Sequence, residues 1–400
     1  MMEYASFNRR KLAAALALAP LCRVSPAFAQ ALKISMGVGL ANEQAPMVAL
    51  LQKDKLLEAA AQELGAGQIE SEYLNFPVLL RMLQGIAAGQ LQFGQLGSTP
   101  NIRSLTSPDP AVPIALIGGF NTFPLQVPPG SPIKNLEGLK GKTVLTILGS
   151  DLHLVLVRAL QAHFGVADPK EIGVTVRNIN ALAELGRAPS GVDAVVSLEP
   201  LAGAAEKAGD LVTILRNDGT TGPGYEGPEG KGAGHKIASF AKTPFAPEAY
   251  YPHRIWWVAR RNYLAENPKV VTALLAATAR ATEKLAAMPV ADVVNIGGES
   301  WTGTKDAQAA WIPTVLWRKR GWNWITEGDV RTLVGLSTTK AIFQQELTAA
   351  KAKEIVGLGA DVAKAAWTHV GQKPARAVFE DKTAGDVRGK PTWEMSDWTL

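Results

Sequence analysis

The chain has 400 residues, of which 47% are hydrophobic and 19% charged, as in ordinary globular proteins that are large enough to form two lobes. Its formal net charge is +5, and residues 1–29 contribute most of this excess. No dense Lys/Arg tract follows residue 29, so we expect no nucleic-acid partner.

Residues 1–29 have the three parts of an export signal. Residues 9–11 (RRK) are basic, residues 12–21 are apolar, and residues 27–29 (AFA) form a small-residue cleavage site. An uncleaved membrane anchor is the alternative, but the apolar run is too short to span a bilayer. We therefore expect a cleaved signal peptide and a periplasmic protein. The paired arginines leave the twin-arginine export route open.

Strands and helices alternate from residue 32 onward. Each predicted strand is a short apolar or alternating run, and the intervening segments have helical periodicity. The predicted strands are 32–38, 69–74, 91–96 and 112–117, and the predicted helices are 43–64, 77–88 and one that starts at 102. This alternation predicts a largely parallel sheet that is covered by helices on both faces.

A second α/β unit follows. Its predicted strands are 125–127, 142–148, 174–179, 192–198 and 211–215, with a helix at 152–164. Residues 217–236 hold seven glycines and two prolines, which predicts a long flexible loop.

The last third of the chain is predicted to be helical. A strand that ends at Val258 returns to the first unit, a long helix spans residues 268–288, and further helices reach about residue 370. All ten tryptophans lie at or after Trp256, and we expect most of them to pack in the core. Trp256 and Trp257 are the alternative candidates for the wall of a cleft.

The same strand-to-helix junction occurs once in each unit. Gly97-Ser98-Thr99-Pro100 follows the third strand, and Gly149-Ser150-Asp151 follows the strand at 142–148. One interpretation is a helix cap with proline in the first turn. The other is an anion site, because ligands bind beyond the carboxyl ends of parallel strands and helix N-termini offer free N–H groups. Asp151 would repel an anion if it faced such a site, or it could cap the helix.

Other motifs give no sign of catalysis. The segment Gly138–Thr143 is two residues too short for a phosphate loop, and the five histidines lack metal-ligand spacing. His153 alone lies in a first helical turn, where it could donate to a ligand or simply be a surface or core histidine. The single cysteine, Cys22, lies in the predicted signal. We expect no metal, no cofactor and no enzymatic activity.

Four stretches carry a resemblance to a known family. They are "LRMLQGIAAGQLQFGQLGSTPNI" (80–102), "SPIKNLEGLKGKTVLTILGSDLHLVL" (131–156), "GVDAVVSLEP" (191–200) and "ENPKVVTALLAA" (266–277). Together they resemble the periplasmic solute-binding proteins of the nitrate/sulfonate/taurine group, which are receptors of ABC importers. The chain departs from the family pattern at Leu198, where tryptophan is frequent, and at Gln92, where an acid is usual.

The resemblance implies an α/β fold of the two-lobed, type II periplasmic-binding-protein kind, with a ligand cleft between lobes joined by a hinge. Lobe 1 would hold residues 30–122 and about 255–400, and lobe 2 residues 123 to about 254. The implied ligand is a small anionic or zwitterionic solute with an oxyanion. The residues expected to face it are Gly37, Asn42, Glu43, Ser98, Thr99, Asn121, Gly149, Ser150, His153, Glu199 and Trp256.

Glu43 has two interpretations within this scheme. It could pair with the ammonium group of a zwitterion such as taurine, or it could be the solvated start of a helix. The implied function is a monomeric receptor that delivers its solute to a permease in the inner membrane. The alternatives are an enzyme on the same fold, related to those that make the pyrimidine precursor of thiamine, and a periplasmic sensor. The cysteine-rich motif of those enzymes is absent.

Overall fold

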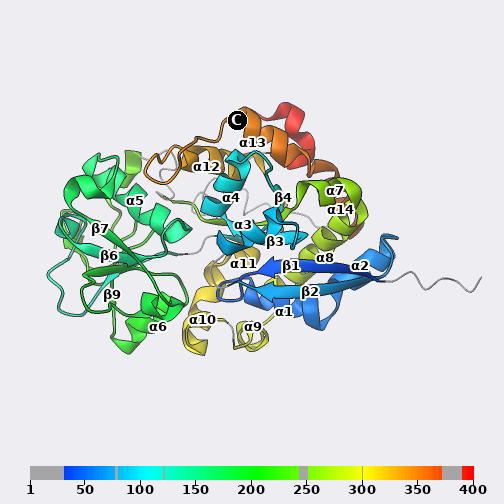
Figure 1. Cartoon of the computed structure of the whole chain (residues 1–400). Helices are drawn as coiled ribbons and strands as arrows, with labels where there is room; N and C mark the ends of the chain where they lie inside the picture. Colours follow the sequence, from blue (N-terminus) through cyan, green and yellow to red (C-terminus); the bar gives the residue numbers. More distant parts are fainter. Residues whose placement is uncertain (1–30, 77–79, 120–121, 243–250, 300, 372–389) are drawn as a thin grey trace, which may run out of the picture. The chain divides into compact units, whose positions relative to one another are not determined.

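The computed structural model describes residues 31–400 except 77–79, 120–121, 243–250, 300 and 372–389. The described residues form two five-stranded sheets and a two-stranded hairpin, with helices around them (Figure 1). The strands are β1 (Leu32–Val38), β2 (Ile69–Asn75), β3 (Phe93–Gly97), β4 (Val112–Gly119), β5 (Leu125–Val127), β6 (Thr143–Thr146), β7 (Thr175–Asn178), β8 (Ala194–Val196), β9 (Val212–Leu215), β10 (Glu226–Gly227), β11 (Gly230–Lys231) and β12 (Arg254–Ala259).

The described chain also forms α-helices. They are α1 (Ala45–Lys53), α2 (Leu56–Glu63), α3 (Leu80–Ala87), α4 (Ser98–Thr106), α5 (Asp151–Phe164), α6 (Leu201–Ala208), α7 (Arg261–Glu266), α8 (Pro268–Ala287), α9 (Val290–Gly297), α10 (Lys305–Trp311), α11 (Leu316–Lys319), α12 (Glu327–Ser337), α13 (Ala349–Gly357) and α14 (Ala360–Val370). The long helix predicted for 268–288 and the helical character up to residue 370 are confirmed.

The two large sheets share one plan. The first has the strand order β2-β1-β3-β12-β4, and the second has the order β7-β6-β8-β5-β9. In the first, β12 is antiparallel to β3 and β4, and β1 is parallel to β2 and β3. In the second, β5 is antiparallel to β8 and β9. The predicted largely parallel sheets are confirmed, with one antiparallel strand in each; the predicted lobe limits stay a prediction.

The core explains the composition of the strands. β3 and β12 are buried along their whole length, as expected for central strands that are covered on both faces, and the edge strand β4 is buried as well. The long helix α8 packs against α1, α2 and α14. Trp256 and Trp257 are fully buried in β12, and Trp317 and Trp322 are buried in the C-terminal region, so the prediction of core tryptophans is confirmed.

The helix predicted for residues 43–64 is two helices. Lys55 has a φ of 47°, in the left-handed region, and separates α1 from α2. Leu51 and Leu57 are both fully buried, although six residues apart on one straight helix they would point about 120° apart. The break at Lys55 therefore lets both leucines face the core.

The glycine-rich segment 217–236 is more ordered than the predicted loop. It contains the β10–β11 hairpin, and the Thr221 hydroxyl donates to the Gly232 carbonyl over 2.7 Å. At its start, Asn217 accepts a hydrogen bond from the Phe123 N–H at 2.8 Å and donates to the Tyr251 carbonyl at 3.0 Å. Asn217 thus connects the segment at Phe123, where the chain leaves the first sheet, to the segment at Tyr251, where the chain returns to it.

Two predictions fall outside the described residues, namely the signal peptide at 1–29 and the site residue Asn121. Among the described helices, none combines the length and the apolar character that a membrane crossing needs.

Candidate functional site

The two predicted junctions meet in the structure. The Thr99 N–H, in the first turn of α4, donates to Oδ1 of Asp151, the first residue of α5, at 2.6 Å. A side chain at Gly97 would collide with the Asp151 carboxylate, so glycine is required where the two segments approach. Asp151 is only 7% exposed. The N-terminus of α4 therefore holds a carboxylate that comes from the second sheet's helix.

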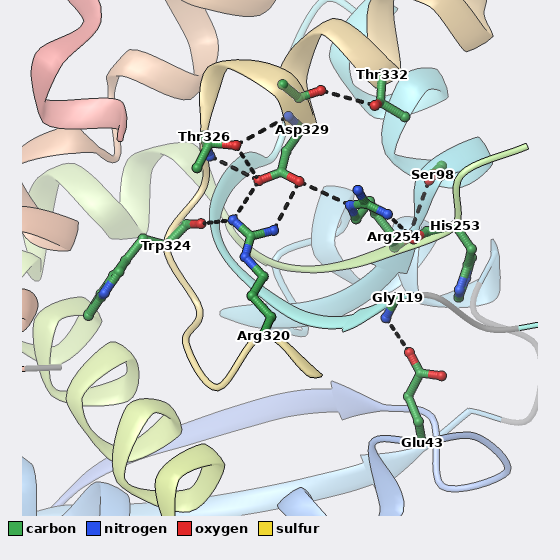
Figure 2. Close-up of polar contacts among 11 residues, drawn as sticks. Glu43, Ser98, Gly119, His253, Arg254, Arg320, Trp324, Thr326, Asp329 and Thr332 are labelled. Atoms are coloured by element: carbon green, nitrogen blue, oxygen red, sulfur yellow. Dashed lines mark hydrogen bonds and ion pairs between the residues drawn. The ribbon is translucent and has the colours of Figure 1, made fainter. Parts of the chain in front are cut away.

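The prediction that Ser98 caps α4 is wrong. The helix begins at Ser98 itself, its N-cap is Gly97, and no side chain caps it from within. The Ser98 hydroxyl instead donates to the Arg254 carbonyl at 3.3 Å, at the start of β12 (Figure 2). The reason is that Asp151 already supplies the acceptor that a capping hydroxyl would provide.

Among the residues that the structure describes, Asp151 has no charged partner near pH 7. Burial raises the pKa of Asp151, and hydrogen bonding to the Thr99 N–H opposes this only in part. His253 Nε2 lies 3.7 Å from Oδ2. Burial, aided by neighbouring Arg254, lowers the pKa of His253 to about 3, so the imidazole is neutral near pH 7 and forms no ion pair.

The backbone N–H groups of Gly149 and Leu152, at the N-terminus of α5, find their acceptors within the same segment. The Ser150 hydroxyl accepts from the Leu152 N–H at 3.2 Å, which confirms the cap interpretation for this junction. The Gly149 N–H donates to Nδ1 of His153, also at 3.2 Å. Burial lowers the pKa of His153 to about 4, which keeps this nitrogen available as an acceptor.

Glu43 lies in the loop between β1 and α1 and is completely buried. Its Oε1 accepts a hydrogen bond from the Gly119 N–H, at the end of β4 (Figure 2). Its backbone carbonyl accepts from Trp317 Nε1 at 3.0 Å. Burial raises the pKa of Glu43 to about 8, and the Gly119 hydrogen bond lowers it only in part. The interpretation of Glu43 as a solvated helix start is wrong.

Several of the buried polar side-chain atoms that have no partner among the described residues lie at or after strand ends. Within the described chain they occur in both large sheets, after β1, β3 and β8 and on the last residue of β6. They include Glu43 Oε2, both amide atoms of Gln44, both amide atoms of Asn101, Thr146 Oγ1 and Ser197 Oγ. An unsatisfied buried group costs about 1–3 kcal/mol, a cost that a bound molecule would offset if it supplied the missing partner.

Sequence reasoning missed Gln44, Asn101, Thr146 and Ser197. Their signal is positional: Asn101, Thr146 and Ser197 lie within five residues of a predicted strand end, and Gln44 is next to the predicted site residue Glu43. Polar side chains at such positions are common in solvent-exposed turns. Only their burial, at 0% exposure, separates them from ordinary turn residues.

The remaining predicted site residues have local roles. Gly37 lies within β1, where an added Cβ would come within 2.9 Å of Leu91, so the lack of a side chain lets Leu91 pack closely against the strand. Glu199 accepts from the Gly203 N–H at 2.9 Å, and burial raises its pKa. Asn42 is half-buried in the turn before α1, and Trp256 is fully buried in β12.

An ion-pair network fixes the start of β12 (Figure 2). Asp329 Oδ1 accepts from Arg254 Nε at 3.0 Å, and Arg320 binds both carboxylate oxygens at 3.1 and 2.9 Å. All three side chains are fully buried. The Thr326 hydroxyl and N–H also donate to Asp329 Oδ2. The described histidines, aspartates and glutamates form no group of three that could hold a metal ion.

Comparison with known proteins gives the family and the fold. The model of the NMT1/THI5-like family matches residues 80–291, more than half of the chain, and no curated protein matches the sequence. The alkanesulfonate-binding protein SsuA from Xanthomonas axonopodis pv. citri is 15% identical, with a TM-score of 0.58; the match covers 80% of this chain and 97% of that one.

Two further solved structures are similar. The aliphatic sulphonate-binding protein SsuA from Escherichia coli is 18% identical, covering 71% of this chain and 83% of that one, with a TM-score of 0.52. The periplasmic nitrate-binding protein NrtA from Synechocystis PCC 6803 is 12% identical, covering 85% and 89%, with a TM-score of 0.60. These similarities and the two mixed sheets define the type II periplasmic-binding-protein fold, which confirms the predicted fold. The chain belongs to the NMT1/THI5-like family.

Proposed function

We propose that this protein is the exported solute-binding receptor of an ABC importer, which captures a small solute and delivers it to a permease in the inner membrane. The proposal rests on the buried polar atoms at the strand ends of both sheets that have no partner among the described residues, together with the Thr99–Asp151 contact. Groups from two sheets that contact one solute would couple its binding to their relative movement.

The similar structures and the geometry of this site favour different classes of solute. The similar structures bind sulfonates and nitrate, which favours the oxyanion-bearing solute that the sequence implies, such as a sulfonate, taurine, nitrate or an organic acid. The geometry offers less to an oxyanion, because Asp151 occupies the first turn of α4 and Ser150 caps α5. An oxyanion at α4 would have to displace the Asp151 carboxylate.

A ligand screen by thermal unfolding tests the proposal. Sulfonates, nitrate, carboxylates, amino acids and amines would be added one at a time, and tryptophan fluorescence would follow each titration. A true ligand at 100 times its Kd should stabilise the protein by about 2.7 kcal/mol. Uptake of that ligand by cells with and without this protein then tests delivery to a permease. A screen in which no solute raises the Tm would count against the receptor function.

Two hydroxyls of the second sheet provide a sharper variant. Thr146→Val combined with Ser197→Ala removes hydroxyls that no described group binds, so the unliganded protein should keep or slightly gain stability. Ligand-induced stabilisation should fall. Thr278→Val is the matched control, because that buried hydroxyl donates to the Leu274 carbonyl within α8. If the double variant bound the ligand as tightly as the wild type, the assignment of the site would be wrong.

A further inference from the structure

The β1–α1 loop presents a carboxylate oxygen and an amide that have no protein partner. Glu43 Oε1 is held by the Gly119 N–H and the Glu43 backbone by Trp317, so the side chain has a fixed place. Its second oxygen, Oε2, is buried without a partner among the described residues. Figure 2 shows the carboxylate at the end of β4, close to the start of β12.

Gln44 extends this feature. Its side chain is fully buried, and neither its amide nitrogen nor its amide oxygen has a described partner. Both side chains lie over Gly118: an added Cβ there would collide with Glu43 Oε1 and come within 2.7 Å of Gln44 Nε2. The backbone of β4 thus provides room for a carboxylate and an amide side by side.

The electrostatic environment favours positive charge at this place. In the described part of the chain, no lysine or arginine pairs with Glu43, and the nearby Arg254 binds Asp329. Asp151 adds a second buried carboxyl group at Gly97, on the far side of β12 from Gly119. Two neighbouring interstrand spacings separate these glycines, about 10 Å. A cationic group beside Oε2 would lower the pKa of Glu43 from its value of about 8 and favour the ionised carboxylate, in which Oε2 accepts a hydrogen bond.

We propose that the solute carries a protonated nitrogen, such as an ammonium or amidinium group, which donates to Glu43 Oε2, while Gln44 binds an adjacent polar group. This rests on the proposed receptor function and narrows its substrate class to cations and zwitterions. A hydrogen bond between charged groups at a buried position is strong enough to discriminate between solutes. A solute without the nitrogen would leave Glu43 Oε2 without a donor and would bind more weakly.

Matched solute pairs test the proposal by calorimetry and thermal unfolding. The pairs are taurine with ethanesulfonate, β-alanine with propionate, and n-propylamine with 1-propanol. We expect binding by one or more nitrogen-bearing members and at least tenfold weaker binding by their partners. Binding of the nitrogen-free anions alone, or equal binding within the pairs, would overturn the proposal while leaving the receptor function intact. If neither these pairs nor the wider screen yields a ligand, the receptor function itself fails.

The variant Glu43→Gln separates charge from shape. Its amide oxygen still accepts from Gly119, but the negative charge is gone. We expect binding of the nitrogen-bearing solute to weaken about 10- to 100-fold and binding of its nitrogen-free partner to improve. Glu206→Gln is the control, because this carboxylate binds Thr213 in the second sheet, at β9. Unchanged affinities in Glu43→Gln, with both variants folded, would overturn the proposal.

Discussion

Glu43→Gln should also change the stability of the unliganded protein, in a way that depends on pH. Burial raises the pKa of Glu43 from its ordinary 4.5 to about 8. A raised pKa in the folded state means that the favourable contribution is present below pH 4.5 and is lost as the pH rises through 8, because folding then requires either proton uptake or a buried charge. The glutamine variant lacks this dependence.

The magnitude follows from the two pKa values. At 1.36 kcal/mol per pH unit, the wild type should lose about 3 kcal/mol more of its free energy of unfolding than the variant between pH 5 and pH 8. Other groups act in the opposite direction: the lowered pKa values of His153 and His253 make stability rise with pH up to about 6.5. Their contribution is common to both proteins and cancels in the difference.

Urea unfolding followed by circular dichroism, at pH 5, 6, 7 and 8, measures this difference directly. The two proteins should have similar free energies of unfolding at pH 5, and Glu43→Gln should be the more stable at pH 8. Parallel pH profiles would refute the reasoning, because they would mean that the Glu43 carboxylate is no more costly to ionise in the folded protein than in the unfolded chain.

Three further substitutions probe the site and its support. Asp151→Ala should destabilise the protein by about 1–3 kcal/mol in urea unfolding, because the buried Thr99 N–H loses its acceptor, and wild-type stability would contradict the contact. Gly118→Ala should lower the Tm through a collision with the Glu43 carboxylate, at a cost of about 1–3 kcal/mol, whereas an unchanged Tm would show that the carboxylate lies elsewhere. Asp329→Asn should cost about 3–5 kcal/mol, since two buried arginines lose their common anion, and a loss under 1 kcal/mol would contradict that role.

Much of the fold could be predicted because its signals are local. The apolar runs that became β1 and β4, and the helical period of α5 and α8, are set by residues close together in the sequence. The break at Lys55 could not be predicted, because no glycine or proline near it marks the end of a helix and only tertiary packing demands a turn there. Similarly, the glycine-rich segment is held by residues distant in the sequence, since Asn217 binds Phe123 and Tyr251, and Asn135 donates to the Glu226 carbonyl in the hairpin.

The site was harder to predict because its residues are defined by burial and by distant partners. Ser98 and Ser150 each follow a glycine at a strand-to-helix junction, yet only Ser150 caps its helix. The difference is Asp151, which lies 52 residues beyond Thr99 in the sequence and reaches its N–H. Glu43 has the sequence context of a solvated helix start, and its burial depends on β4 and on Trp317 from the C-terminal region.

The position of Asp151 links the fold to the nature of the solute. An α-helix N-terminus attracts any carboxylate or oxyanion, whether from a solute or from the chain itself. In this protein the chain supplies one, so the attraction that would bind a free anion instead joins the first turn of α4 to that of α5. Glu43 adds a second buried carboxyl group, and we propose that a positive charge on the solute ionises it and supplies the partner that its Oε2 lacks among the described residues.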